Sequence, residues 1–233
     1  FVMGTVEDSL DGIFAALRES ALTMQQGGGI GIDFSTLRPR AAPADATGGI
    51  ASGPVSFMDL WNQMSDTVTG VSPRRGAMMG TLSCEHPDVA AFVDAKRRAG
   101  RLTHFNLSVL VSAAFMRAGE VDADWTLAFA RAGVERRVGA RALWDAIVDS
   151  AYASAEPGVL FIDRIRAEDN LAYAETISAT NPCGEIPLPP YGACDLGSIN
   201  LAAFVRDPFP PGAQLDAGAI AALVPLAVRM LDN

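Results

Sequence analysis

A short segment rich in proline and glycine around a cysteine limits what this chain can fold into more than any other feature. It reads Asn181-Pro182-Cys183-Gly184-Glu185, and more prolines and a glycine follow before Cys194. Proline removes backbone hydrogen-bond donors and glycine widens the accessible dihedral angles, so this segment cannot hold a regular helix. The pattern predicts a shaped loop that presents a thiol, an amide and a carboxylate close together.

The residue types in this loop suit a combination of sulfur and acid–base chemistry. A thiol can exchange a hydrogen atom, a nearby carboxylate can take a proton, and a second cysteine close in sequence permits two-electron thiol redox. Each residue also has a plainer interpretation. Cys183 can be a buried structural thiol, as many single cysteines are, and Glu185 can be a solvated loop acid. The residues alone leave both interpretations of Cys183 open and favour the plainer interpretation of Glu185.

The segment resembles the active-site loop of the ribonucleotide reductase large subunit, and it is most similar to the adenosylcobalamin-dependent class II enzymes. Further blocks resemble that family in the same order along the chain, and the similarity runs from Phe1 to about Phe204. Several independent blocks in one order make a specific signal. The further blocks are Gln25–Gly31, Thr47–Met58, Arg74–Gly80, Phe105–Val109 and Ala193–Leu201.

The spacing of apolar residues predicts helices that alternate with strands. Apolar residues at helical spacing indicate helices over residues 10–21, 57–68 and 140–155, with another after Pro87 that ends at Lys96-Arg97-Arg98. Apolar runs indicate buried strands over residues 106–112 and 159–162. This alternation is typical of an α/β fold.

The resemblance implies a more specific architecture. The fold would be part of a ten-stranded α/β barrel, with the Cys183 loop as a finger through its centre. Residues 1–233 are expected to form the N-proximal part of the catalytic barrel domain, as a fragment that continues beyond both ends.

The resemblance also implies a role for each residue of the loop. Cys183 would hold a transient thiyl radical that removes the 3′ hydrogen of a ribonucleotide, Glu185 would act as the base on the 3′ hydroxyl, and Asn181 would hydrogen-bond the ribose hydroxyls. Cys194 would be half of a redox dithiol whose partner precedes Phe1, which would place Phe1 and Val2 beside the Cys183 loop. Cys84 is interpreted as structural, and no metal site is expected, because the cysteines and histidines lack ligand spacing.

Two further groups of residues are expected to bind nucleotides. By resemblance, Gly28 and Gly29 would line the substrate site together with Asn181, Pro182, Cys183, Gly184 and Glu185. Asp8, Ser9 and Leu10 would contact a regulatory deoxynucleotide at a dimer interface, with Arg38 as a phosphate ligand. A helix stop at the glycines and a helix cap at Asp8-Ser9 are the plainer interpretations, and a cap is compatible with an effector site.

Composition limits the possible partners. The net charge of −9 gives no general attraction for polyanions, so phosphate binding must be local, and neither nucleic acid nor a membrane is an expected partner. Three scattered cysteines argue against a disulfide-stapled secreted domain, so a reducing cytoplasm is expected. The expected partners are the ribonucleotide, the deoxynucleotide effector, a thioredoxin-like or glutaredoxin-like reductant and a second copy of the chain.

Together these points predict an oxidoreductase of deoxyribonucleotide biosynthesis, a vitamin B12-dependent ribonucleoside-diphosphate reductase that uses adenosylcobalamin. A triphosphate substrate is an alternative. A class I-type large subunit with a partner radical protein is another, and a catalytically silent nucleotide-binding regulatory module is a third. A thioredoxin-type oxidoreductase is disfavoured because the chain has no C-x-x-C motif.

Overall fold

The computed structural model describes residues 1–44, 49–69, 76–97, 100–209 and 211–232. The chain divides into two units, Phe1–Ala193 and Cys194–Asn233. Residues 47–48 and 74–75, which belong to two of the blocks named above, lie outside the described residues.

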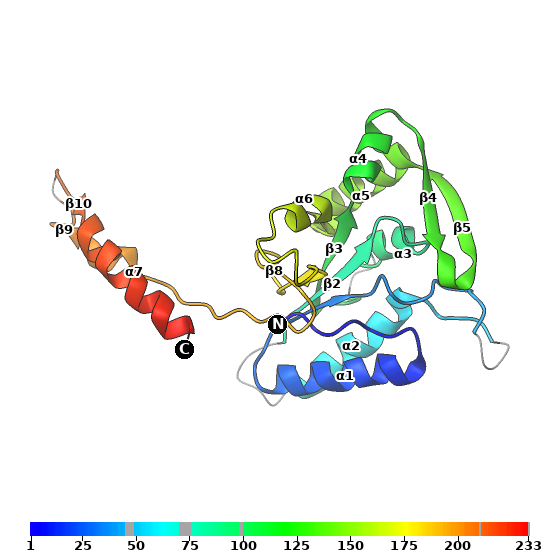
Figure 1. Cartoon of the computed structure of the whole chain (residues 1–233), viewed down its shortest axis with the longest axis horizontal. Coiled ribbons are helices and arrows are strands. Elements are labelled where there is room, and N and C mark those ends of the chain that lie inside the picture. The colour runs from blue at the N-terminus through cyan, green and yellow to red at the C-terminus, as the bar shows by residue number, and fades with distance from the viewer. Residues whose placement is uncertain (45–48, 70–75, 98–99, 210, 233) are drawn as a thin grey trace. The chain divides into compact units, whose positions relative to one another are not determined.

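A sheet of four parallel strands in the order β1-β2-β3-β6 forms the centre of the first unit (Figure 1). Strands β2 and β3 are buried along almost their whole length, as is usual for parallel strands covered on both faces. The α/β prediction is confirmed, and both predicted strands are present within one residue of their predicted ends. The strands are β1 (Ile30–Asp33), β2 (Met78–Ser83), β3 (Phe105–Val111) and β6 (Gly158–Phe161).

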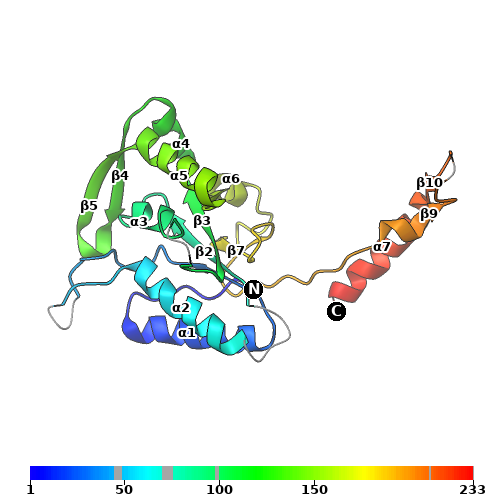
Figure 2. The ribbon, with the colours of Figure 1, turned by 180° about the vertical axis from the view of Figure 1, so that it is seen from behind.

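Helices lie on either side of this sheet. In Figure 1 helices α1 and α2 run side by side below the strands, and α4, α5 and α6 lie above; Figure 2 shows the same arrangement from behind. The Trp61 indole of α2 donates a 2.9 Å hydrogen bond to Ser20 Oγ of α1, and its ring meets Phe34 edge-on at 5.3 Å. The helices are α1 (Leu10–Gln25), α2 (Pro54–Thr69), α3 (Val89–Val93), α4 (Ala113–Glu120), α5 (Ala140–Ser154) and α6 (Ile162–Ala167).

Three of the four predicted helices are confirmed as α1, α2 and α5, and the fourth is shorter than predicted. Helix α3 ends at Val93, so Lys96 is not a basic residue in its last turn. Lys96 instead forms a 2.9 Å ion pair with Glu156, which draws its side chain toward β3.

A long hairpin, formed by β4 (Asp124–Phe129) and β5 (Val134–Gly139), stands beside the sheet (Figure 1). The strands are joined by the 3-10 turn η1 (Ala130–Ala132), followed by Gly133 in the left-handed region. No pattern in the sequence predicted this hairpin.

The second unit is a small separate unit in which most residues are exposed. Arg206 pairs with Asp216, whose other oxygen accepts a 3.0 Å hydrogen bond from the Ala219 amide at the start of α7. No helix among the described residues is both long and apolar enough to cross a bilayer. The elements are η2 (Leu201–Phe204), β9 (Val205–Arg206), β10 (Gln214–Leu215) and α7 (Ala217–Asp232).

Candidate functional site

The predicted loop around Cys183 is a closed turn between two short antiparallel strands, β7 (Ala179–Thr180) and β8 (Pro187–Leu188). The Ile186 amide donates to Asn181 Oδ1 at 3.0 Å, and the Gly184 amide donates to the Asn181 carbonyl oxygen at 3.1 Å. Gly184 has a φ of 92°, a conformation that side chains disfavour. The turn buries Asn181 and leaves the side chains of Cys183 and Glu185 exposed.

Glycines in and before β1 allow this loop to approach the sheet closely. A Cβ on Gly31 would lie 1.7 Å from the Thr180 carbonyl oxygen, and a Cβ on Gly29 would lie 2.7 Å from Pro182 Cγ. From the sequence, Gly28 and Gly29 are expected to allow the close approach of a ligand. The structure places Gly29 against Pro182 of the loop itself, whereas Gly28 lies against Thr23 and the Phe1 ring.

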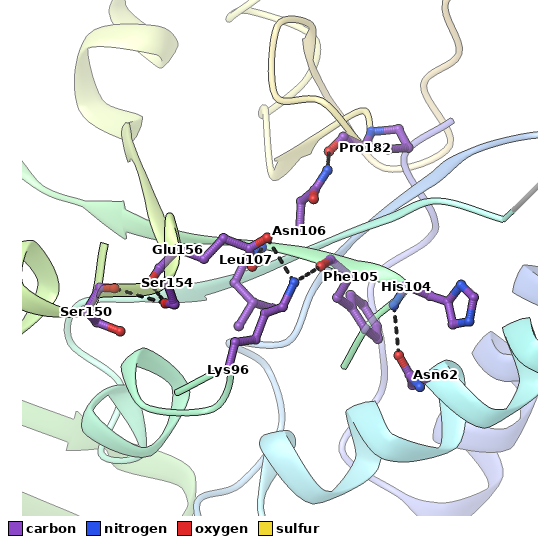
Figure 3. A network of polar contacts seen from close by, with 10 residues as sticks. All are labelled: Asn62, Lys96, His104, Phe105, Asn106, Leu107, Ser150, Ser154, Glu156 and Pro182. Atoms are coloured by element: carbon purple, nitrogen blue, oxygen red, sulfur yellow. Dashed lines mark hydrogen bonds and ion pairs between the residues drawn. The ribbon is translucent and has the colours of Figure 1, made fainter. Parts of the chain in front are cut away.

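A residue to which the sequence analysis gave no role holds the loop to a second strand. Asn106 Nδ2 in β3 donates a 2.7 Å hydrogen bond to the Pro182 carbonyl oxygen, in the peptide that leads into Cys183 (Figure 3). Asn106 is the exposed member of a strand that is otherwise buried. The sequence signal that could have indicated this role is the polar amide of Asn106 within an otherwise mostly apolar strand.

The first residues of the chain pair with the segment that leads to Cys194. The Val2 amide donates to the Gly192 carbonyl oxygen at 2.8 Å, the Tyr191 amide donates to the Val2 carbonyl oxygen at 2.9 Å, and on its other side Val2 bridges Gly31 of β1. Val2 therefore lies between β1 and the segment that follows the Cys183 loop. Cys194 is half-buried and begins the second unit.

The four residues expected at an effector site lie together. Asp8, Ser9, Leu10 and Arg38 all line a cavity of about 590 Å³. An adjoining cavity of about 600 Å³ is lined by three of them and also by Arg131, a cation that the sequence analysis did not assign to the site.

Asp8 and Ser9, which were expected to cap the first helix together, have different roles in the structure. Ser9 is the N-cap of α1 and accepts a 3.0 Å hydrogen bond from the Gly12 amide. Asp8 instead binds Arg38, with its two carboxylate oxygens accepting from the Arg38 amide at 3.0 Å and from Arg38 Nε at 2.9 Å. This ion pair holds the guanidinium at the edge of both cavities.

A buried histidine fixes the backbone next to Arg38. His86 Nε2 contacts the Leu37 carbonyl oxygen at 2.8 Å, and His86 Nδ1 accepts from the Asp88 amide at 3.0 Å, so the neutral Nε2–H tautomer satisfies both nitrogens. Asp88 in turn accepts a 2.7 Å hydrogen bond from the Arg40 amide. Burial lowers the pKa of His86 below its ordinary value.

The remaining cysteine is Cys84, which is fully buried and contacts Ser112 Oγ at 3.9 Å. Desolvation raises the pKa of its thiol to about 11, so it stays protonated at neutral pH. This environment agrees with the structural role expected from the sequence.

Comparison with known proteins identifies relatives along the whole chain. The family model described as "Ribonucleotide reductase, barrel domain" matches residues 1–233. A vitamin B12-dependent ribonucleoside-diphosphate reductase of Mycobacterium tuberculosis (strain CDC 1551 / Oshkosh) is 43% identical over 230 residues, covering 98% of this chain and 32% of the relative. A protein of the same name from Thermoplasma acidophilum is 40% identical, covering 98% of this chain and 29% of the relative.

A more distant relative carries no B12 qualification in its name. The ribonucleoside-diphosphate reductase large subunit of Vaccinia virus (strain Copenhagen) is 27% identical over 239 residues, covering 89% of this chain and 31% of the relative. The chain spans about a third of the length of the curated relatives it matches.

Proposed function

The chain belongs to the ribonucleotide reductase barrel-domain family, and on that premise we propose that the protein containing it reduces ribonucleotides to 2′-deoxyribonucleotides. The observation that carries the proposal is the exposure of Cys183 and Glu185, two residues apart, on a turn closed by Asn181. A reacting thiol and its base need a fixed relative position, and the turn supplies one.

Asn181 is suited to hold the ribose by donating hydrogen bonds. Its Oδ1 is committed to the Ile186 amide inside the turn. Among the described residues none accepts a hydrogen bond from its Nδ2, so that amide can donate to a ribose hydroxyl. The structural role and the binding role of Asn181 therefore use different atoms of one side chain.

The proposed reaction balances with groups on this chain and one further thiol. The Cys183 thiyl radical takes the 3′ hydrogen atom while the Glu185 carboxylate accepts the 3′ hydroxyl proton, and the 2′ hydroxyl leaves as water. Two electrons and their protons come from the dithiol of Cys194 and its partner, which becomes a disulfide. The 3′ hydrogen atom then returns from the Cys183 thiol to the sugar, which regenerates the thiyl radical, and Glu185 returns its proton to the 3′ oxygen.

Adenosylcobalamin is the proposed radical source, since the relatives of 40–43% identity are named vitamin B12-dependent. The exposed thiol of Cys183 fits this assignment because a hydrogen-atom acceptor must be able to reach the sulfur. When bound, the cofactor supplies a one-electron oxidant that removes the thiol hydrogen. We assign no residue of this chain to cobalamin itself.

We further propose a ribonucleoside diphosphate as substrate, a deoxynucleotide effector in the cavities beside Asp8 and Arg38, and a thioredoxin-like or glutaredoxin-like reductant in a reducing cytoplasm. A homodimer is supported by exposed apolar side chains on α1, among them Phe14 (53% exposed) and Leu22 (48%). Residues 1–233 would be the N-proximal part of the catalytic barrel domain.

The test uses the full-length protein with ribonucleoside diphosphates, a dithiol reductant and adenosylcobalamin. Deoxynucleotide product that depends on the cobalamin supports the proposal. Product that appears without cobalamin, on addition of a separate radical protein, would assign the chain to a class I-type enzyme. Nucleotide binding without turnover under either condition would identify a silent regulatory module.

A further inference from the structure

We infer that Asn106 is the positioning residue of the Cys183 loop, and that the Lys96–Glu156 ion pair holds Asn106 in place. The inference rests on the proposed role of Cys183 and adds Asn106 to the residues that the proposed reaction needs. Figure 3 shows the Asn106 side chain extending from β3 to the loop, while Lys96 approaches the same strand from the other side.

The hydrogen bond from Asn106 acts on the peptide that carries the Cys183 nitrogen. A carbonyl oxygen only accepts, so the atom facing the Pro182 oxygen at 2.7 Å must be the Asn106 amide nitrogen. A peptide unit is planar from one Cα to the next, and holding its oxygen therefore restrains the position of the Cys183 Cα. The bond joins residues 76 positions apart, so it restrains the loop against a strand outside it.

The ion pair fixes both peptides that flank Asn106. Lys96 Nζ donates to the Phe105 carbonyl oxygen at 2.6 Å and to Glu156 Oε1 at 2.9 Å. Glu156 Oε2 accepts a 3.2 Å hydrogen bond from the Leu107 amide. One carbonyl before Asn106 and one amide after it are thus held by side chains from two other segments.

Burial makes this bracing effective. The side chains of Lys96 and Glu156 are 19% and 18% exposed, so the pair is largely shielded from solvent. Lys96 is also the one lysine in the sequence. An ammonium can direct separate donors to a carbonyl and a carboxylate at the same time, as it does here.

The test is Asn106→Asp in the full-length enzyme, with Asn62→Asp as the matched control. The isosteric carboxylate cannot donate to the Pro182 oxygen. Asn62 uses its Oδ1 to accept a 3.0 Å hydrogen bond from the His104 amide, so the same change at position 62 keeps the acceptor. The two variants share one chemical change and differ in whether the lost amide donor makes a hydrogen bond, as it does at Asn106 and not at Asn62 among the described residues.

Two readouts separate this inference from the proposed function. Amide hydrogen exchange over residues 181–186 needs no catalytic activity, and we expect it to accelerate about tenfold in Asn106→Asp, because the loss of one hydrogen bond makes local opening of the turn easier. We also expect kcat to fall roughly 10–100-fold from misplacement of the thiol, with KM within about twofold of the original enzyme. Asn62→Asp should match the original enzyme in both readouts.

Unchanged exchange and unchanged kcat in Asn106→Asp would overturn the inference. So would a raised KM with unchanged exchange, since it would mean that Asn106 contacts the substrate instead. Neither result would bear on whether Cys183 performs radical chemistry, which is tested separately by replacing that residue.

Discussion

The Val2 amide donates a 2.8 Å hydrogen bond to the Gly192 carbonyl oxygen, joining the first residues of the chain to the segment that leads into Cys194. Cys194 follows Gly192 by two residues, so its Cα lies within about 7 Å of the Gly192 Cα. A disulfide needs Cα atoms roughly 4.4–6.8 Å apart. The proposed redox role therefore requires a cysteine next to Phe1 on the preceding side to come this close to Cys194.

We predict that single turnover of the full-length enzyme without reductant leaves a disulfide between Cys194 and a cysteine preceding Phe1. Peptide mapping before and after addition of a dithiol should show the bond form and disappear. Pairing of Cys194 with Cys84 or Cys183 in the folded protein would disprove the redox assignment. Cys84 is a poor candidate because its buried thiol, with a pKa of about 11, stays protonated.

Replacing Cys183 by alanine should abolish turnover in the full-length enzyme. It should also abolish cobalamin-dependent hydrogen exchange at the 5′ carbon of the cofactor, because no thiol remains to return the hydrogen. Cys84→Ala serves as the control, since that thiol is buried away from the loop surface. Exchange at the original rate in Cys183→Ala would remove this residue from the mechanism.

Gly31→Ala should displace the Cys183 loop from β1. The added methyl group would meet the Thr180 carbonyl oxygen at 1.7 Å, and overpacking of this kind costs about 1–3 kcal/mol of unfolding free energy. Denaturant unfolding measures the loss, and turnover should fall with it. Gly119→Ala in α4 is the matched control, because its Cβ would have no heavy atom within 4 Å. Equal stability of the two variants would contradict the packing described here.

Acidification should destabilise the protein through His86. Burial lowers the pKa of His86 in the folded state. As the pH falls below the ordinary value of about 6.5, the unfolded chain therefore binds a proton at His86 while the folded chain does not. The stability contribution is thus complete above about pH 6.5 and is lost progressively below it. Melting temperatures of the original protein should fall more steeply between about pH 7.5 and 5.5 than those of His86→Gln. Parallel curves would show that His86 carries no such linkage.

Asp8→Ala should blunt the effect of a deoxynucleotide effector on substrate preference while basal turnover remains measurable. The reason is that Asp8 holds the Arg38 guanidinium at the cavity edge through Nε. Asp94→Ala removes an exposed Asp–Arg pair elsewhere, with Arg97, and should leave the response unchanged. An intact effector response in Asp8→Ala would place the effector site elsewhere.

The sequence predicted those elements of the fold that have a clear pattern of apolar residues within one continuous segment. Apolar spacing located α1, α2 and α5, and the apolar run after Phe105 located β3. Strands β1 and β2 were missed because Gly31 and Gly80 lower strand propensity, although both glycines relieve packing against neighbouring atoms in the structure. The hairpin was missed because β5 carries charged residues and its turn lacks an Asn-Gly or Asp-Gly signal.

The candidate site likewise has features that the sequence predicted and features that it did not. The loop and its exposed thiol follow from the proline and glycine pattern together with the family resemblance. The Asn106 contact with Pro182 and the entry of Arg131 into the Asp8 cavity depend on chain segments that meet only in three dimensions. No spacing rule within a single segment encodes either of them.

The contacts that hold the Cys183 turn also govern when it can form during folding. Its partners lie in and before β1 and in β3, and contacts between such distant positions incur a loop-closure entropy that delays them. We therefore expect the turn to take shape late, after the parallel sheet has assembled. Under the radical role proposed for Cys183, a partly folded chain would lack an ordered site for that radical until the scaffold is complete.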